Sequence, residues 1–173
     1  IKFKFKMKLL PDSIKFFIIN RLFEIGGVTS IILSFFILLS VVSYSSFDPN
    51  ILNISNYQTQ NFGGYLGASI SEILLQLFGY SCFLICVILV SWSYKLFFTK
   101  NLELFALNLV LLPFTVFLLS LFFEILNLPI ISGFVAKEVF LFLDNTGIFL
   151  VSYYFYLFVA VNIILFLFLF YFT

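Results

Sequence analysis

The chain has 173 residues, of which 63% are hydrophobic and only 10% are charged, and its formal net charge is +1. Soluble domains carry roughly a quarter charged residues, so a globule of this size could not hide this much apolar surface from water. The composition excludes soluble enzymes, and the near-zero charge excludes a broad basic surface for nucleic acids. The absence of histidine excludes His-ligated haem, the common zinc sites and Ser-His-Asp triads.

Residues 1–24 are predicted to form a basic cytoplasmic segment. Six of the nine Lys and Arg residues lie within it, and lysine alternates with large apolar residues at its start. Two interpretations stay open: the segment rests on anionic lipid headgroups, or it is a charge cluster that only orients the chain in the membrane.

Four windows without charged residues follow, and each holds the ~20 apolar residues that cross a hydrocarbon core of about 30 Å. They predict membrane-spanning helices at about 25–45, 73–95, 104–123 and 148–171, with outer loops at 46–72 and 124–147. The predicted fold class is all-α, a polytopic membrane protein whose four-helix domain covers residues 25–172 and carries amphipathic segments in its outer loops. Cys82 and Cys86 stand inside the second window and are expected to pack as small apolar residues.

The distribution of Lys and Arg predicts the orientation of the chain. Eight of these residues fall on the side of the N-terminus and of the turn between the second and third helices, against one, Lys137, in the outer loops. The positive-inside rule therefore places both termini in the cytoplasm.

The two outer loops have similar patterns. In the first, a turn signal at Asp48-Pro49 and a glycine-rich stretch lead into apolar positions spaced for one helix face, at about 65–74. In the second, Ser132-Gly133 precedes an amphipathic run at 134–142 that is too short to span and is interfacial or re-entrant. The motif at 64–67 lines up with that at 133–136, and Gly79 with Gly147. Either an internal duplication or convergence explains this.

Ionisable groups, which mark transport pathways in membrane helices, are absent from the predicted helix midpoints. Asn108 and Asn162 are the most interior amides, and two interpretations stay open: each bonds a neighbouring helix, or each serves only packing and the shape of the bundle. Pro113 is expected to kink the third helix. The sequence contains no phosphate-binding loop, so no catalytic or metal site is predicted.

Three segments of the first half resemble the membrane domain of the FtsK/SpoIIIE DNA translocases. Residues 43–49, SYSSFDP, are similar to the S-(F/Y)-x-x-x-D-P signature of that family. Residues 61–68, NFGGYLGA, are similar to its N-x-G-G-x-x-G-A, and residues 77–81, LFGYS, to its (L/I)-(F/L)-G-x-x-(A/S). The four-helix layout and the basic N-terminus also match, so the resemblance covers essentially the whole chain.

The resemblance implies an anchor in the bacterial inner membrane at the division septum, acting in cell division and chromosome segregation. It implies as partners the lipid bilayer, other division proteins and further copies of the chain, as a hexamer. The family's motor, which uses ATP and Mg²⁺ and contacts DNA, would follow Thr173. Only anchoring, targeting and oligomerisation therefore carry over, without a cofactor or catalytic activity in this chain.

Two alternatives remain, a small transporter or channel subunit and a generic structural subunit of a membrane complex. A transporter should show intramembrane charge or a helix broken at the midplane. Contacts between copies are expected to depend on small and polar residues, among them Gly67, Ser71, Asn108 and Asn162. The residues predicted to matter for structure and assembly are Asp48, Pro49, Asn61, Gly63, Gly64, Gly67, Gly79, Asn108, Pro113 and Asn162.

Overall fold

A computed structural model describes residues 11–54, 56–100, 105–126, 128–145 and 152–171, and within these ranges the chain is helix or loop without a strand. This confirms the all-α fold class. The elements in chain order are α1 (Asp12–Val42), α2 (Gly64–Phe78), the 3-10 helix η1 (Gly79–Cys82), α3 (Phe83–Phe98), α4 (Phe105–Ile125), α5 (Pro129–Ser132), α6 (Phe134–Asn145) and α7 (Ser152–Tyr171).

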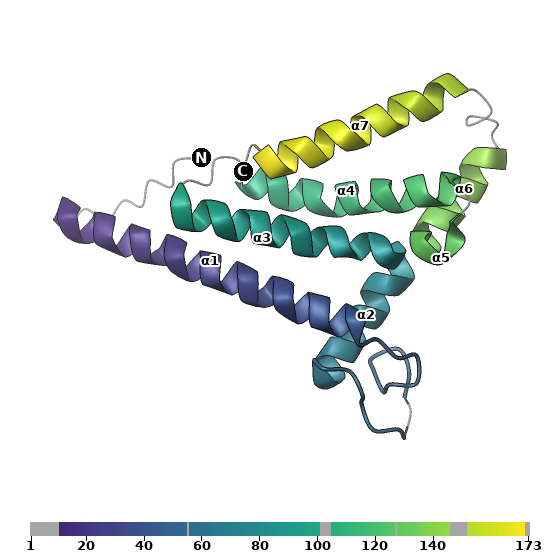
Figure 1. The fold of residues 1–173 in the computed structure, drawn as a ribbon, viewed down its shortest axis with the longest axis horizontal. Coiled ribbons are helices and arrows are strands. Elements are labelled where there is room, and N and C mark those ends of the chain that lie inside the picture. The colour runs from purple at the N-terminus through teal and green to yellow at the C-terminus, as the bar shows by residue number, and fades with distance from the viewer. Residues whose placement is uncertain (1–10, 55, 101–104, 127, 146–151, 172–173) are drawn as a thin grey trace.

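The four long helices α1, α3, α4 and α7 lie side by side as an open fan, and α2, α5 and α6 gather at one end of it (Figure 1). α1 packs mainly on α3 and α2, whereas α4 packs on α5, α6 and α7. α2 and η1 also contact α5 and α6, so the two halves of the chain meet at this end. α1 begins and α7 ends toward the opposite end of the fan (Figure 1).

The helices differ in two places from the predicted spans. α1 begins at Asp12, directly after Pro11, rather than near residue 25, because a helix can continue beyond the hydrocarbon core where charged residues are tolerated. The continuous helix predicted over 73–95 does not form. α2 ends at Phe78, because Gly79 has φ +59° and ψ −150°, a conformation that no α-helix contains.

In the second half, α4 closely follows the window predicted at 104–123, and α7 lies within the window at 148–171. α4 runs through Pro113 as one helix, and the kink expected there stays a prediction. Residues 148–151 and Gly147, with its predicted alignment to Gly79, lie outside the described part of the chain.

The core lies between α1 and α3. Its buried side chains are Ile37, Val41, Cys82, Cys86, Ile88, Leu89 and Trp92. The two cysteines are free thiols in this cluster, as their expected packing role requires. Ser93 Oγ donates to the Gly27 carbonyl at 2.8 Å and Ser34 Oγ to the Cys86 carbonyl at 3.0 Å, so hydrogen bonds also join the two helices.

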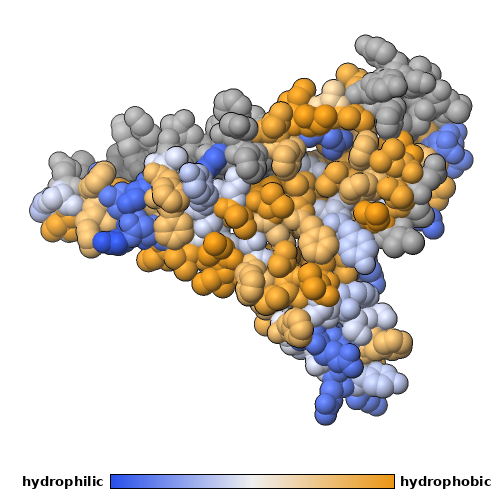
Figure 2. All heavy atoms as spheres, viewed as in Figure 1, coloured by the Kyte–Doolittle hydropathy of each residue, from blue (hydrophilic) through white to orange (hydrophobic). Residues whose placement is uncertain are grey.

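The surface of the fan is apolar along the helices. Figure 2 shows hydrophobic residues over the helical body, with hydrophilic ones gathered at the start of α1, on the loop between α1 and α2, and beside α6. Three segments in the described ranges are long and apolar enough to span a bilayer, Ser13–Val42, Gly64–Phe98 and Leu107–Ile125, and Leu157–Leu167 is a shorter apolar helix.

Candidate functional site: the outer loops

The loop between α1 and α2, residues 43–63, is closed by the buried carboxylate of Asp48, which is 1% exposed. Asp48 Oδ1 accepts a hydrogen bond from the backbone N–H of Gln60 at 2.9 Å, and Oδ2 accepts one from that of Asn61, also at 2.9 Å. Hydrogen bonds to an ionised carboxylate are about twice as strong as those between neutral groups. Asp48 therefore holds the two ends of the loop together.

Asn61 fastens this closed loop to the end of α1. Its Nδ2 donates to the backbone carbonyls of Ser40 at 2.8 Å and Ser43 at 3.4 Å. These carbonyls belong to the end of the helix, where no backbone N–H from a further turn can reach them. Asn61 Oδ1 accepts from the N–H of Gly63 at 2.9 Å, and Ser43 Oγ accepts from the N–H of Phe62, also at 2.9 Å. The side chain therefore caps α1 and directs the entry into α2.

Two glycines, Gly63 and Gly67, allow this close approach, and a third, Gly64, supplies a backbone conformation. A Cβ on Gly63 would lie 2.7 Å from Ser40 Oγ, and one on Gly67 would overlap the Asn61 amide and lie 2.8 Å from the same hydroxyl. Gly64 has φ +62° and open space around it, so backbone conformation alone favours glycine there. Positive φ and close backbone contacts are thus both present in this stretch, and they lie within one chain.

A second asparagine organises the tip of the loop. Asn50 Oδ1 accepts from the backbone N–H groups of Leu52 and Asn53, each at 2.8 Å, and the N–H of Ile51 donates to Ser69 Oγ on α2 at 3.2 Å. Asn50 stands beside the predicted Asp48-Pro49 turn, which was a signal for this role. Ser40, Ser43 and Ser69 were missed, because serines in or beside an apolar helix commonly bond only their own helix.

Glu72 on α2 is 8% exposed and lies against the end of α1. The hydroxyl of Tyr44 and the amide of Gln76 both donate to its carboxylate. Burial, and then the adjacent Glu72, raise the pKa of Tyr44 to about 12, because both disfavour the phenolate. The tyrosine thus stays a neutral donor and satisfies a carboxylate at the apolar end of the bundle.

The two halves of the chain meet backbone to backbone at Gly79 and Gly133. Gly79 has φ +59° and ψ −150°, and Gly133 has φ +79° and ψ 166°. Only glycine adopts this region readily. A Cβ on Gly79 would overlap the carbonyl oxygen of Ile131 and lie 2.7 Å from the nitrogen of Gly133, and one on Gly133 would lie 2.6 Å from the Phe78 carbonyl carbon. The structure thus pairs Gly79 with Gly133.

The second outer segment is fastened by three polar side chains. Ser120 on α4 donates from Oγ to the backbone carbonyl of Ser132, and Ser132 Oγ donates to the Glu124 carboxylate. Ser120 and Ser132 are fully buried. These bonds hold α5 against α4, immediately before Gly133. The sequence carried no signal for the partners of Glu124.

The interior polar residues differ in their contacts. Asn162 Nδ2 donates to the carbonyl of Phe158 at 3.0 Å, within α7, rather than to a neighbouring helix. Asn108 is fully buried, and neither its Nδ2 nor its Oδ1 has a hydrogen-bond partner among the described residues. Gly67 and Ser71, like Asn108, are buried within the single chain, and their predicted part in contacts between copies stays a prediction.

The hydrogen bonds of Asp48 and Asn61 hold in place an outer loop that exposes apolar side chains. The one charged side chain of this loop, Asp48, is buried. The large apolar side chains that the loop exposes are Phe47, Ile51, Leu52, Ile54, Tyr57 and Phe62, and polar side chains such as Gln58 are exposed among them. Among the residues that the structure describes, no cluster of three or more His, Cys, Asp or Glu side chains is placed to hold a metal. The exposed apolar surface is suited to docking on protein or lipid.

A family model described as the 4TM region of DNA translocase FtsK/SpoIIIE matches residues 20–172 of the chain. The match includes both outer segments, the Gly79–Gly133 contact and all four long helices from Asn20 onward. No curated protein and no solved structure matches the chain.

Proposed function

Because the chain belongs to the family of the 4TM region of FtsK/SpoIIIE DNA translocases, we propose that it targets such a translocase to the division septum and assembles its subunits there. The single observation that carries the proposal is the network of Asp48 and Asn61, which fixes an outer loop with exposed apolar side chains. The proposed location is the bacterial inner membrane, with both termini in the cytoplasm.

A rigid loop favours docking because little conformational entropy is lost when a partner binds. The side chains of Phe62 and Phe47 are 75% and 70% exposed. Their neighbours in the chain, Asn61 and Asp48, are hydrogen-bonded to each other, and the backbone N–H of Phe62 donates to Ser43. Partners for this surface are other division proteins and, through the helix faces, further copies of the chain, as a hexamer. DNA contact and ATP hydrolysis belong to the motor of the family, so the four-helix domain acts without catalysis.

The helix break at Gly79–Cys82 meets one criterion of the transporter alternative. In a transporter, such a break lines a cavity and binds substrate. Here the backbone of Ile131 and Gly133 fills the space beside Gly79, so the break serves packing between the two halves. The anchor therefore explains this feature better than a transport pathway does.

The test is a fluorescent fusion of residues 1–173 expressed in dividing bacteria. We expect enrichment at the division site and oligomers in mild detergent. Phe62→Ser should reduce enrichment without lowering the membrane level, because its side chain is exposed and its backbone bond to Ser43 remains. Gln58→Ser, also exposed on this loop, is the matched control and should leave enrichment unchanged. An evenly distributed, strictly monomeric fusion would refute the proposal.

A further inference from the structure

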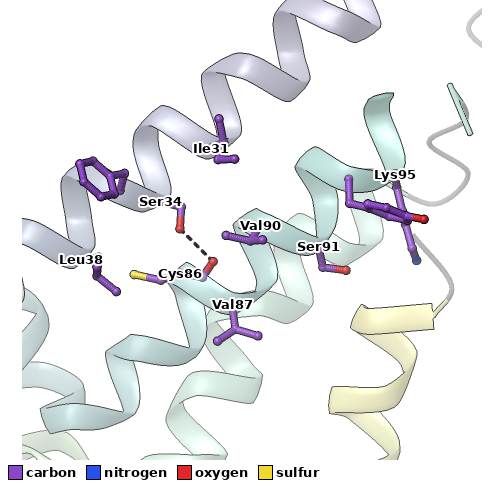
Figure 3. Close-up of a pocket in the computed structure, with 10 residues that line it drawn as sticks. Ile31, Ser34, Leu38, Cys86, Val87, Val90, Ser91 and Lys95 are labelled. Carbon is purple, nitrogen blue, oxygen red and sulfur yellow. Dashed lines mark hydrogen bonds between the residues drawn. The ribbon is translucent and has the colours of Figure 1, made fainter. Parts of the chain in front are cut away.

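An apolar groove of about 750 Å³ runs between α1 and α3 (Figure 3). Its walls are aliphatic and aromatic, with Ile31, Phe35 and Leu38 from α1 and Val87 and Val90 from α3. Ser34 also lines it, but its hydroxyl is committed to the Cys86 carbonyl at 3.0 Å. This volume is within the range of ligand sites in proteins.

One end of the groove is polar. Ser91 and Lys95 of α3 lie there, at the end opposite Leu38 (Figure 3), and Tyr94, which precedes Lys95 on α3, also lines the groove. All three side chains carry hydrogen-bond donors, and Lys95 adds a positive charge. The Lys95 Nζ is buried and has no hydrogen-bond partner among the described residues. The nearby Lys100, in contrast, pairs with Glu24 at 3.1 Å. Burying an ammonium group without a partner costs free energy, and an anion bound beside Lys95 would offset that cost.

The length and position of the groove fit one leaflet of a bilayer. From Cys86 to Lys95, the wall on α3 is about 13 Å long at 1.5 Å per residue, close to half of a ~30 Å hydrocarbon core. Lys95 lies one turn before the end of α3, at the end of the bundle where Lys100 and Arg21 both contact Glu24. Lipid headgroups meet a membrane protein at such a level.

We propose that this groove binds an anionic phospholipid, with an acyl chain along α1 and α3 and the phosphate held by Lys95, Ser91 and Tyr94. The four-carbon stem of Lys95 lets its ammonium swing from its buried position to the mouth of the groove. The lining of the groove contains hydrogen-bond donors but no carboxylate. It therefore favours an anionic headgroup over a zwitterionic one, because the ammonium group of a zwitterionic headgroup would find no acceptor there. This site is independent of the proposed septal function.

The test uses the full 173-residue chain in mild detergent, with bound lipid counted by native mass spectrometry during titration with phosphatidylglycerol or phosphatidylcholine. We expect phosphatidylglycerol to bind at least about fivefold more tightly, the factor expected from one lysine at a membrane surface. Inorganic phosphate at equal concentration should not displace it, because a free anion gains nothing from the apolar groove. Displacement would reduce the site to an anion site and overturn the proposal.

Two pairs of variants separate headgroup from chain. Lys95→Gln should abolish the preference for phosphatidylglycerol, whereas Lys15→Gln, at the same end but outside the groove, should keep it. Val90→Trp should fill the groove and weaken both lipids, whereas Ile32→Trp, exposed on α1 outside the groove, should weaken neither. Equal binding of the two lipids to the unaltered chain, or equal effects within either pair, would overturn the proposal. Val90→Trp decides the matter if Lys95→Gln does not fold.

Discussion

The two outer segments of the chain begin alike and are fastened differently. α2 starts at Gly64 and α6 directly after Gly133, both glycines have positive φ, and the third residue after each, Gly67 or Ala136, is small and buried. The first segment fixes itself through Asp48 and Asn61 on its own long loop. The second is short and borrows Ser120 and Glu124 from α4. The first segment, with its long loop, thus carries the side chains that fasten it, whereas the short second segment is fastened by side chains of α4.

This comparison also shows where the halves depend on each other. An internal duplication would explain why both segments start with a glycine of positive φ. The duplication itself stays a prediction. The contact between Gly79 and Gly133, however, joins the end of α2 in one half to the start of α6 in the other. A substitution in the first loop should therefore disturb only that loop, whereas a substitution at the contact between Gly79 and Gly133 should separate the two halves of the chain.

The largest effect is expected at the glycine contact. Gly79→Ala and Gly133→Ala should each destabilise the domain by about 3 kcal/mol, because the new methyl meets backbone atoms and the conformation is strained for alanine. Gly64→Ala is the matched control, since its φ is also positive but its surroundings are open, and should cost about 1 kcal/mol. Thermal unfolding in detergent, followed by circular dichroism, measures this. Equal losses at Gly64 and Gly79 would contradict the account.

The next effect is expected at Asp48. Asp48→Ala should cost about 2 kcal/mol, because the buried backbone N–H of Asn61 and the part-buried one of Gln60 lose their acceptor. The damage should stay in the loop, so limited proteolysis should cut residues 43–63 while α3 and α4 remain protected. Gln58→Ala, exposed on the same loop, should behave as the unaltered chain. Cleavage spreading to α5 and α6 would show that the two segments are not independently fastened.

The smallest effect concerns Tyr44 and high pH. The pKa of Tyr44 is raised from its ordinary 10.0 to about 12, so its contribution to stability is complete below pH 10 and is lost as the pH rises toward 12. Tyr44→Phe should remove this loss and flatten the stability profile between those pH values. Tyr57→Phe, on the exposed tip of the loop, is the control and should leave the profile unchanged. A profile unaltered by Tyr44→Phe would exclude the interaction with Glu72.

The sequence was most informative where composition or backbone conformation decides the structure. Uncharged windows predicted the apolar helices, and the Asp48-Pro49 and Asn61–Gly64 motifs predicted a turn and a glycine-dependent entry into α2. The pairing of Gly79 with Gly133 was not predictable, since nothing in the local pattern states which distant backbone a glycine will meet. The break at Gly79 was missed because an apolar run continues through it and hydropathy does not report φ.

Polar residues in the helices were the hardest to assign from sequence. Asn162 bonds its own helix and Asn108 finds no partner among the described residues, although the same chemical argument had left a neighbouring helix open for both. Which face of a helix a side chain occupies depends on packing, and the uniform apolarity of these helices gives no amphipathic pattern to read it from.

The central claim is that both outer segments lie together on one side of the membrane, and that the C-terminal end of α3, at Phe98, lies on the opposite side. The direct measurement is labelling of intact cells with a membrane-impermeant thiol reagent, in a chain with Cys82 and Cys86 replaced by alanine. Gln58→Cys and Lys137→Cys, both exposed, should be labelled from outside, and Thr99→Cys, also exposed, only after the cells are opened. Protection of either outer position, or labelling of Thr99→Cys in intact cells, would contradict the account.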